Sequence, residues 1–442
     1  MNLREFLNAA SEKGWLVRIN RPVDPELELA AVAYALDGRP VLFENVVGHS
    51  GWRVVTGVAS ARKHFALALE ANPGDVIFRL AEAQAHPLPA PVVDDAPCQE
   101  VVHRPGDLDT LPILKHLPDD AGPYVTAGVA IVRDPDTGLN ASYHRLLPLD
   151  ERHVAARLVE HRGAYNAWKK TERDLPIAIA IGLPLHVLLA ASMSPPAGVF
   201  EMDIAQALAP TPLARCLTND LLVPAEAEIV LEGRLTHRLA AEGPFVDLTE
   251  TSDIVRQQPV IVIDAITHRR DPIYHALLPG QLEHKLLMGM PKEPGIYAAV
   301  REVADVRNVH ITPGGASWLH AVVQIAKRHP DDGRRAIEAA YRGHGSLKHV
   351  VVVDEDIDIF DPNDVEWAIA TRVQAGRDVI IFRDQPSSSL DPSARHVPGQ
   401  KSRSDKAGVD ATIPWDAPGG PSHPEHFRRI PFPKVNLADY LP

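Results

Sequence analysis

The segment Asn140-Ala141-Ser142-Tyr143-His144-Arg145 places three polar groups of different chemistry close together. It follows an apolar stretch at residues 124–132 and a turn at residues 134–138, so it is expected to be extended. Alternate residues of a strand point to one face, which here gathers an amide, a hydroxyl and, near its end, a guanidinium. Such a face could hold a metal-bound phosphate at one end and a substrate carboxylate at the other. A strand with a plain solvent-facing side is the alternative.

Two further positions supply groups that bind hard metal ions. His161 follows a stretch with helical spacing, and Glu201 closes a Pro-rich loop that begins near Ser192. Each has a structural alternative, because His near a helix end often interacts with the helix dipole and Glu often lies at a helix start. Together with Asn140 they offer an amide oxygen, an imidazole nitrogen and a carboxylate. This set suits Mn²⁺ or Mg²⁺ and not structural zinc.

Two acids in Glu242-Gly243-Pro244-Phe245-Val246-Asp247 are candidates for proton transfer. On a straight strand they would face opposite ways, but Gly-Pro interrupts the strand and lets both point into one cavity. A nearby arginine would keep one carboxylate ionised, while like-charge repulsion would raise the pKa of the other. An exposed turn is the alternative. Glu228 and Glu232 form a competing pair, but their alternation with apolar residues predicts the solvent edge of a half-buried strand.

The elements that position these residues fall into three regions. Residues 1–105 alternate helix and strand, as do residues 301–384 of the C-terminal region 301–442, and the central residues 106–300 are rich in β-branched runs. We therefore expect a multidomain α/β fold with a central β-barrel or strongly twisted sheet. Residues 153–160 and 318–326 are predicted to be helices. The Pro-, Ser- and Gly-rich last 58 residues are predicted by composition to be a flexible tail.

The composition of the chain limits its class. Its 442 residues are too many for one ordinary core, and 45 % apolar and 23 % charged residues are typical of a soluble globular protein. A net charge of −13 without a basic stripe argues against nucleic acid as a partner, and any anionic ligand would need local cations or a metal. Cys98 and Cys216 cannot build a disulfide framework. No signal peptide or membrane span is predicted, so a cytoplasmic protein is expected.

Several motifs occur in an order and spacing that resemble one family. They are DDAGPYVTAG (119–128), IVRDP (131–135), TNDLLVPAEAEIVLEG (218–233), EGPF (242–245), HVVVVDEDID (349–358) and SDKAGVDAT (404–412). Over nearly its whole length the chain resembles the UbiD-type decarboxylases, which use prenylated FMN. The resemblance implies an N-terminal α/β region, a central split β-barrel of flavin-binding type and a C-terminal α/β region. It also implies an ordered tail up to about Thr412.

The resemblance further implies a cofactor and metal site. Asn140, His161 and Glu201 match the family's ligands for a Mn²⁺ ion that bridges to the cofactor phosphate. A neighbouring K⁺ is implied as well, with its oxygen ligands at positions that match Ala141, Ser192, Met193 and Glu201. Lys406 matches the lysine that contacts the phosphate. The cofactor-binding residues implied are Asn140, Ser142, Tyr143, His144, Arg145, His161, Ser192, Met193, Glu201 and Lys406.

The catalytic residues implied by the resemblance are Arg145, Glu242 and Asp247. The family commonly has Glu at the last position, preceded by Gly, where this chain has Val246-Asp247. The acid is thus one methylene shorter. Tyr143-His144 likewise replaces an Ile-Tyr pair that is common in the family, so His144 is either a pocket residue or a hydrogen-bonding support for one.

The activity implied is the non-oxidative, reversible decarboxylation of an α,β-unsaturated or (hetero)aromatic carboxylic acid. Prenylated FMN would be the electron sink that lets CO₂ leave. Arg145 would orient the substrate carboxylate and the cofactor, Asp247 would be the general acid, and Glu242 would hold Arg145. A flavin prenyltransferase would supply the cofactor, and a homodimer or higher homo-oligomer is expected.

Two alternatives remain open. One is an FMN-dependent flavin reductase, which needs a nicotinamide hydride donor although no GxGxxG follows a strand. The other is a non-catalytic subunit of a decarboxylase complex, against which the presence of Arg145, Glu242 and an acid at 247 argues.

Overall fold

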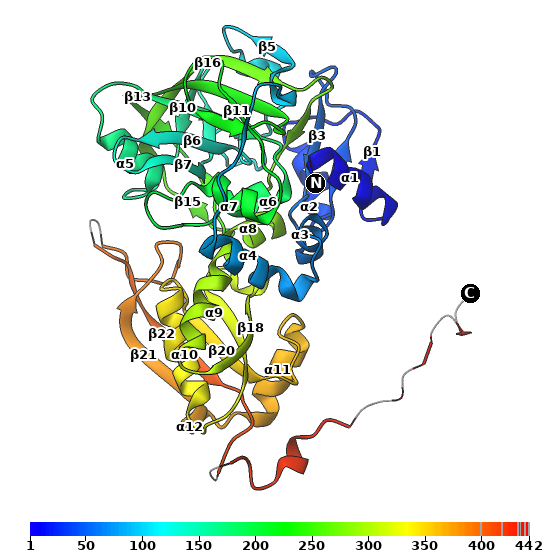
Figure 1. The fold of residues 1–442 in the computed structure, drawn as a ribbon, viewed down its shortest axis with the longest axis vertical. Helices are drawn as coiled ribbons and strands as arrows, with labels where there is room; N and C mark the ends of the chain where they lie inside the picture. The colour runs from blue at the N-terminus through cyan, green and yellow to red at the C-terminus, as the bar shows by residue number, and fades with distance from the viewer. Residues whose placement is uncertain (398–399, 417–418, 431–432, 434, 437–438, 441–442) are drawn as a thin grey trace.

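The computed structural model describes residues 1–397, 400–416, 419–430, 433, 435, 436, 439 and 440. Figure 1 shows two bodies, one above the other. The N-terminal and central regions form the upper body, and the C-terminal sheet and its helices form the lower body. The chain passes from one to the other through α8 (Leu282–Gly289), the short 3₁₀ helix η4 (Met290–Lys292) and α9 (Glu293–Arg301).

The N-terminal region is a small α/β layer. Its sheet has the order β1 (Val17–Ile19), β2 (Val41–Phe43), β3 (Arg53–Thr56) and β17 (Ile273–His275), so a strand from much later in the chain completes it. Helix α1 (Leu3–Glu12) begins with a capping box between Asn2 and Glu5. The other helices are α2 (Glu28–Ala35), α3 (Arg62–Ala68) and α4 (Val76–Ala85).

The central region is built on one eight-stranded antiparallel sheet with the order β7-β6-β10-β13-β16-β9-β8, to which β5 adds by pairing with β16. Its strands are β5 (Val101–His103), β6 (Val129–Asp134), β7 (Gly138–Tyr143), β8 (Leu146–Pro148), β9 (His153–Ala156), β10 (Leu175–Ile181), β13 (Ile229–Glu242) and β16 (Arg256–His268). The helices of this region are α5 (Gly163–Lys169), α6 (Leu185–Ala191) and α7 (Glu201–Leu208). Every residue of α6 is buried, so this helix crosses the core.

The two edges of this sheet come together at one short link. Strands β7 and β8 stand at opposite ends of the strand order, yet only His144 and Arg145 separate them in the chain. Three peptide steps reach at most about 10 Å, so the sheet curls until its edges adjoin. No ladder joins β7 to β8 among the described residues. The sheet is therefore not a closed barrel, and the split barrel implied by the resemblance is not established.

The remaining strands form three further sheets. One has the order β12 (Leu222–Pro224), β11 (Leu213–Arg215), β4 (Val92–Val93), and a hairpin pairs β14 (Phe245–Val246) with β15 (Ser252–Asp253). The C-terminal sheet has the order β18 (Asp305–Ile311), β19 (His320–Ala326), β20 (His349–Asp354), β22 (Arg403–Asp410), β21 (Val379–Pro386). Its helices, besides α9, are α10 (Asp332–Gly343), α11 (Pro362–Arg372) and α12 (Ala375–Asp378).

Two segments predicted to be helices are strands. Residues 153–160 contain β9, which pairs with β8 on one side and β16 on the other. Residues 318–326 contain β19, which lies between β18 and β20. In both segments, pairing with two neighbouring strands outweighs the helical spacing of the apolar residues.

The prediction of a flexible tail from composition is wrong for residues 403–412. Strand β22 pairs with both β20 and β21, and a Cβ on its Gly408 would lie 2.3 Å from Ile337 of α10. Ala411 and Thr412 are buried as well. Order up to Thr412, as the resemblance implied, is confirmed.

No helix within the described ranges is both long enough and apolar enough to cross a membrane.

The expectation that Glu228 and Glu232 lie on a solvent edge is also wrong, because both side chains are fully buried. Glu228 accepts hydrogen bonds from Arg4 Nε at 2.7 Å and Arg4 Nη2 at 2.8 Å. Glu232 accepts one from the backbone of Leu217 at 2.9 Å. The Arg4–Glu228 pair thus fastens helix α1 to the central sheet.

Replacing Glu228 by Gln should lower the free energy of unfolding by about 3 kcal/mol, because it leaves the Arg4 guanidinium without its buried counter-charge. Urea denaturation measures this loss. Glu226→Gln is the matched control: Glu226 is part-exposed and pairs with Arg269 at 3.3 Å, so its loss should be at most about 1 kcal/mol. Equal losses in the two variants would contradict the anchoring role of Glu228.

Candidate active site

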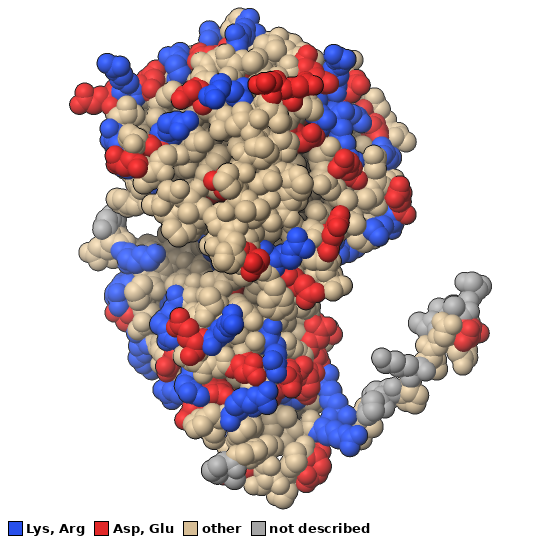
Figure 2. Space-filling view, in the orientation of Figure 1, with Lys and Arg blue, Asp and Glu red and all other residues tan. Residues whose placement is uncertain are grey.

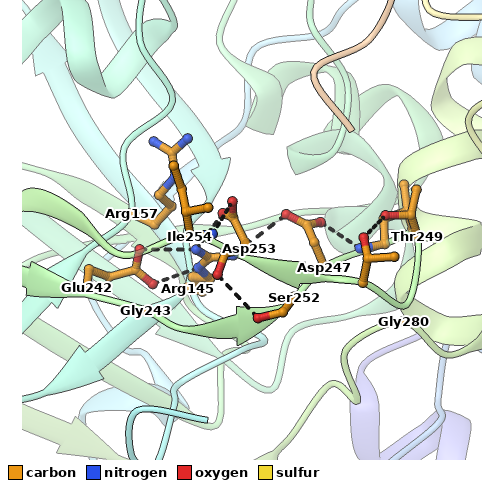
Figure 3. A network of polar contacts seen from close by, with 12 residues as sticks. Arg145, Arg157, Glu242, Gly243, Asp247, Thr249, Ser252, Asp253, Ile254 and Gly280 are labelled. Carbon is orange, nitrogen blue, oxygen red and sulfur yellow. Dashed lines mark hydrogen bonds and ion pairs between the residues drawn. The ribbon is translucent and has the colours of Figure 1, made fainter. Parts of the chain in front are cut away.

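Arg145 is held at the junction of the sheet edges by a fully buried carboxylate. Its Nε donates to Glu242 Oε1 at 2.7 Å and its Nη2 to Glu242 Oε2 at 3.1 Å, which makes a bidentate pair. The side chain of Glu242 is 0 % exposed and that of Arg145 is 11 % exposed. The Tyr124 hydroxyl donates to Glu242 Oε1 at 3.3 Å. These contacts fix the guanidinium in a place largely shielded from water (Figure 3).

A third acid, Asp253, joins this network, and the sequence analysis missed it. Its Oδ2 accepts from Arg145 Nη2 at 2.9 Å and lies 2.6 Å from Arg256 Nη1. Burial alone would raise the pKa of Asp253, but the hydrogen bond with Arg256 and the charge of Arg145 hold it below its usual value. The β14–β15 hairpin brings Asp253 here by pairing it with Phe245. A mostly polar run at residues 247–253, between the apolar pairs Phe245-Val246 and Ile254-Val255, was the signal for this hairpin.

Asp247 lies by the remaining edge of the guanidinium. Its Oδ2 is 3.6 Å from Arg145 Nη1, which is an ion pair but too long for a hydrogen bond. Its side chain is 25 % exposed, so Asp247 is the most accessible of the three acids. Figure 3 shows it pointing toward Arg145 from the hairpin loop. The structure thus brings Arg145, Glu242 and Asp247 together.

Two aromatic rings cover the ion pair. The Arg145 guanidinium carbon is 4.9 Å from the centre of the Phe245 ring, which is close enough for a cation–π contact. The Tyr124 ring packs on Phe245 at 4.4 Å. Both rings are buried, so they exclude water from this side of Arg145.

His284 of α8 is another group near the acids that the sequence analysis missed. The Gly280 amide donates to its Nδ1 at 3.1 Å, which places the proton of the neutral ring on Nε2. Burial lowers the pKa of His284, while the charge of Asp247 raises it and that of Arg145 lowers it. The ring is therefore a neutral donor within electrostatic reach of both residues.

Asn140 and Glu201 contact each other at a second site. Asn140 Nδ2 donates to Glu201 Oε1 at 2.9 Å, and the Ala141 amide donates to Glu201 Oε2 at 2.7 Å. Burial raises the pKa of Glu201 to about 7. Asn140 Oδ1 is buried and accepts no hydrogen bond from any described residue. A buried amide oxygen without a partner, next to a carboxylate, fits a hard cation.

His161, the third predicted metal ligand, lies two residues before Gly163, which packs against Asn140. It is exposed, its φ is 62°, and its ring centre is 6.0 Å from that of Tyr165. In the described part of the chain it forms no hydrogen bond with Asn140 or Glu201. Gly163, two residues further along the chain, nevertheless lies against Asn140: a Cβ on Gly163 would be 2.2 Å from Asn140 Oδ1. The structure therefore brings Asn140 and Glu201 into contact, and it keeps His161 close to them in the chain without a direct hydrogen bond.

The residues that precede Arg145 stiffen the strand end. Ser142 Oγ and His144 Nε2 are 3.0 Å apart, and His144 Nδ1 is 2.9 Å from the carbonyl oxygen of Arg157. Burial lowers the pKa of His144 to about 4, so the ring is neutral at pH 7. The hydroxyl of Tyr143 is buried and forms no hydrogen bond with any described residue. His144 thus connects β7 to the residue that follows β9.

The loop after α6 contacts the amine of a partly buried lysine. Ser192 Oγ donates to the Leu188 carbonyl at 2.8 Å, and Met193 is buried, so this loop can offer backbone oxygens to a ligand. Lys292 Nζ donates to Ser194 Oγ at 2.9 Å. Burial, and then the charge of Arg162, lower the pKa of Lys292 to about 8. The sequence analysis missed Lys292.

Lys406 supplies a second amine from the lower body. Its Nζ donates to the Gly345 carbonyl at 2.7 Å, and burial lowers its pKa to about 8. Burial, and then the charges of Lys292 and Lys406, lower the pKa of His344 to about 4. Figure 2 shows a hollow between the two bodies with Lys and Arg side chains along its lower rim. Such a group of amines fits an anion such as a phosphate.

Comparisons with known proteins agree with this architecture. Three domain families match: the 3-octaprenyl-4-hydroxybenzoate carboxy-lyase N-terminal domain at residues 7–84, the Rift-related domain at residues 91–282 and the C-terminal domain at residues 285–411. The anhydromevalonate phosphate decarboxylase of Methanosarcina mazei is 44 % identical over 418 residues, covering 93 % of this chain and 96 % of the relative. That of Methanothermobacter thermautotrophicus is 43 % identical over 438 residues, covering 97 % and 99 %.

Solved structures give the same result. The UbiD-class enzyme HmfF from Pelotomaculum thermopropionicum in complex with FMN has a TM-score of 0.93 at 42 % identity, covering 99 % of this chain and 100 % of that one. An evolved dimeric form of the same enzyme in complex with prFMN has a TM-score of 0.89 at 41 % identity and covers 100 % of both chains.

The fold and the site therefore define an enzyme of the carboxy-lyase class with a mixed α/β multidomain fold. The chain belongs to the UbiD family. The flavin complexes of its structural neighbours support a flavin cofactor.

Replacing Gly163 by Ala should lower the affinity for Mn²⁺ by about 10-fold or more, because the new methyl group displaces the Asn140 amide. Metal titration of the purified protein measures the affinity. Gly376→Ala is the control, since a Cβ there meets nothing within 4 Å. Equal affinities in the Gly163 variant and the wild type would remove Asn140 from the proposed metal site.

Proposed function

We propose that this chain catalyses the non-oxidative, reversible decarboxylation of a phosphorylated α,β-unsaturated carboxylic acid with prenylated FMN. The observation that carries the proposal is the position of Arg145 between a buried and an accessible acid. A fixed guanidinium binds a carboxylate with defined geometry. An accessible acid beside it is placed to deliver a proton where that carboxylate was.

The hydrogen bonds of Arg145 decide which of its edges meets the substrate. Glu242 occupies Nε and one N–H of Nη2, and Asp253 occupies the other N–H of Nη2. Among the described residues, none forms a hydrogen bond with Nη1, so this nitrogen is left to orient a carboxylate. Asp247 lies on this side, so it serves as the general acid that protonates the carbon from which CO₂ departs. Glu242 keeps the guanidinium oriented and ionised throughout.

The bound prenylated FMN would supply an electron sink for the carbon–carbon bond that breaks. Asn140 and Glu201, with His161 beside them, would hold a Mn²⁺ ion at its phosphate. Carbonyl oxygens of the loop that follows α6 would bind K⁺. Lys292 and Lys406 supply positive charge that would offset the phosphate.

The names of the relatives support the substrate class. The two methanogen proteins, more than 40 % identical over nearly the whole chain, are anhydromevalonate phosphate decarboxylases, so their substrate carries a phosphate besides its carboxylate. This favours a phosphorylated unsaturated acid over an aromatic one. A flavin prenyltransferase would supply the cofactor, and we propose a homodimer, as an evolved form of the neighbour HmfF is dimeric.

Replacing Asp247 by Asn should lower kcat by about 100-fold or more while the cofactor stays bound, because the variant keeps the shape of the side chain and loses its proton. CO₂ release and the visible spectrum of the flavin measure the two quantities. Asp247→Glu should retain much of the activity. Glu250→Gln, in the same hairpin loop but exposed and paired with Lys285, should turn over normally. Full activity in the Asn variant would exclude Asp247 as the acid.

A further inference from the structure

One side chain of the N-terminal region, Arg62 at the start of α3, reaches into the lower body. Its Nη2 donates to the carboxylate of Glu293, the first residue of α9, and to His310 Nδ1 of β18 at 3.1 Å. Its guanidinium carbon lies 5.0 Å from the centre of the Phe360 ring, which is close enough for a cation–π contact. A single arginine of the upper body thus engages three separate segments of the lower body.

The ion pair between Arg62 and Glu293 is shielded from water. The side chain of Glu293 is 0 % exposed and that of Arg62 is 10 % exposed. Burial alone would raise the pKa of Glu293, but the charge of Arg62 holds it below its usual value, so the carboxylate is ionised at pH 7. Glu293 Oε1 also accepts from the Ile311 amide at 3.0 Å. A buried charge is tolerated only beside its partner, so the pair constrains how the two bodies meet.

This pair is the charged contact between the two bodies. Within the part of the chain that the structure describes, no other ion pair joins the upper body to the lower body. The neighbouring contact between α4 and α9 is apolar: Ile77 packs in the lower-body core, and the Phe78 ring is 5.4 Å from that of Tyr297. Apolar packing is non-directional, whereas a hydrogen-bonded ion pair has a defined geometry. Arg62 therefore orients the lower body.

The residue that precedes Glu293 is Lys292, one of the two amines that we assign to the cofactor phosphate. Lys292 is the N-cap residue of α9, and its Nζ donates to Ser194 Oγ in the upper body at 2.9 Å. Consecutive residues thus extend to two different parts of the upper body, the carboxylate to Arg62 and the amine to the loop after α6. Holding Glu293 fixes the backbone from which Lys292 extends.

We propose that Arg62 is a positioning residue for the phosphate group of the bound flavin, and that it acts by holding Glu293 and thereby Lys292. This inference rests on the proposed function, which assigns Lys292 to that phosphate. Arg62 contacts neither the phosphate nor the substrate. Its role is to keep the joint between the two bodies in the arrangement that brings the amine to the phosphate.

The test compares the dissociation constants of FMN and of riboflavin, which lacks the phosphate. Both are measured on the purified protein by quenching of flavin fluorescence in the presence of Mn²⁺ and K⁺. Arg62→Met should raise the Kd for FMN about 10-fold, because one hydrogen bond between charged groups is lost at the phosphate. The Kd for riboflavin should change less than about twofold. An unchanged Kd for FMN, or an equal rise for both flavins, would overturn the inference.

A double-mutant cycle shows whether Arg62 acts through Lys292. Lys292→Met should raise the Kd for FMN by a factor similar to that of Arg62→Met. Combining the two changes should alter the Kd less than about threefold relative to Lys292→Met, because the second change removes nothing further. Losses that multiply would show that the two residues act independently, which would contradict the proposal.

A second combination separates positioning from stability, since an unpaired buried charge can itself destabilise the fold. Arg62→Met together with Glu293→Gln leaves neither charge alone and keeps an oxygen that can accept from the Ile311 amide. This protein should resist urea better than either single variant, yet its Kd for FMN should remain raised. Recovery of the affinity together with the stability would leave Arg62 a purely structural role and would overturn the inference.

Arg4→Met is the matched control. It breaks another pair between an arginine of the N-terminal region and a fully buried glutamate, Glu228, but within the upper body. The ratio of the two dissociation constants should equal that of the wild type. A change in this ratio as large as in Arg62→Met would mean that any loss of a buried pair produces the effect, which would contradict the proposal.

Flavin binding requires no turnover, so the same measurements separate this inference from the proposed function. If the wild type decarboxylates no acid while Arg62→Met weakens FMN selectively, the proposed function fails and the positioning role of Arg62 stands. If the wild type decarboxylates the phosphorylated acid while Arg62→Met binds FMN as tightly as the wild type, the inference alone fails.

Discussion

The site depends on one interaction, the bidentate pair between Arg145 and the fully buried Glu242. Arg145 occupies the short link at which the two edges of the central sheet adjoin, and Glu242 ends one of its longest strands. A buried carboxylate is tolerated only with such a partner, so each residue requires the other. The pair commits the guanidinium to one orientation and leaves Nη1 next to Asp247, which is the edge that we propose orients the substrate.

Local charge resolves how a chain with a net charge of −13 can hold anions. Lys292 donates to Ser194 in the loop that follows α6, and Lys406 donates to the Gly345 carbonyl in the lower body. Burial lowers the pKa of both amines to about 8. On the sheet face, Arg145 contacts Glu242, Asp247 and Asp253, and Asp253 also contacts Arg256. Basic side chains are thus found at both of the places where we propose that anionic groups bind.

Sequence reasoning predicted what is local and missed what sheet pairing decides. Gly-Pro after Glu242 correctly indicated that this acid and Asp247 can face one cation. The interruption of the strand lies between the two acids, within a segment of six residues, so it can be recognised from the local sequence. Asp253 was missed because a hairpin carries it there, and β9 was taken for a helix because two neighbouring strands override its spacing. Lys406 was found only through family resemblance, since the composition of its segment resembles a disordered tail while its strand lies inside a sheet.

A double-mutant cycle on the central pair tests this account most directly. The quantity measured is kcat/KM of holoenzyme for Arg145→Lys, Glu242→Gln and the combined variant. If Glu242 acts by holding Arg145, the combined variant should be within about threefold of the weaker single variant, because the second change removes nothing further. Losses that multiply would mean that the two residues act independently, which would contradict the account.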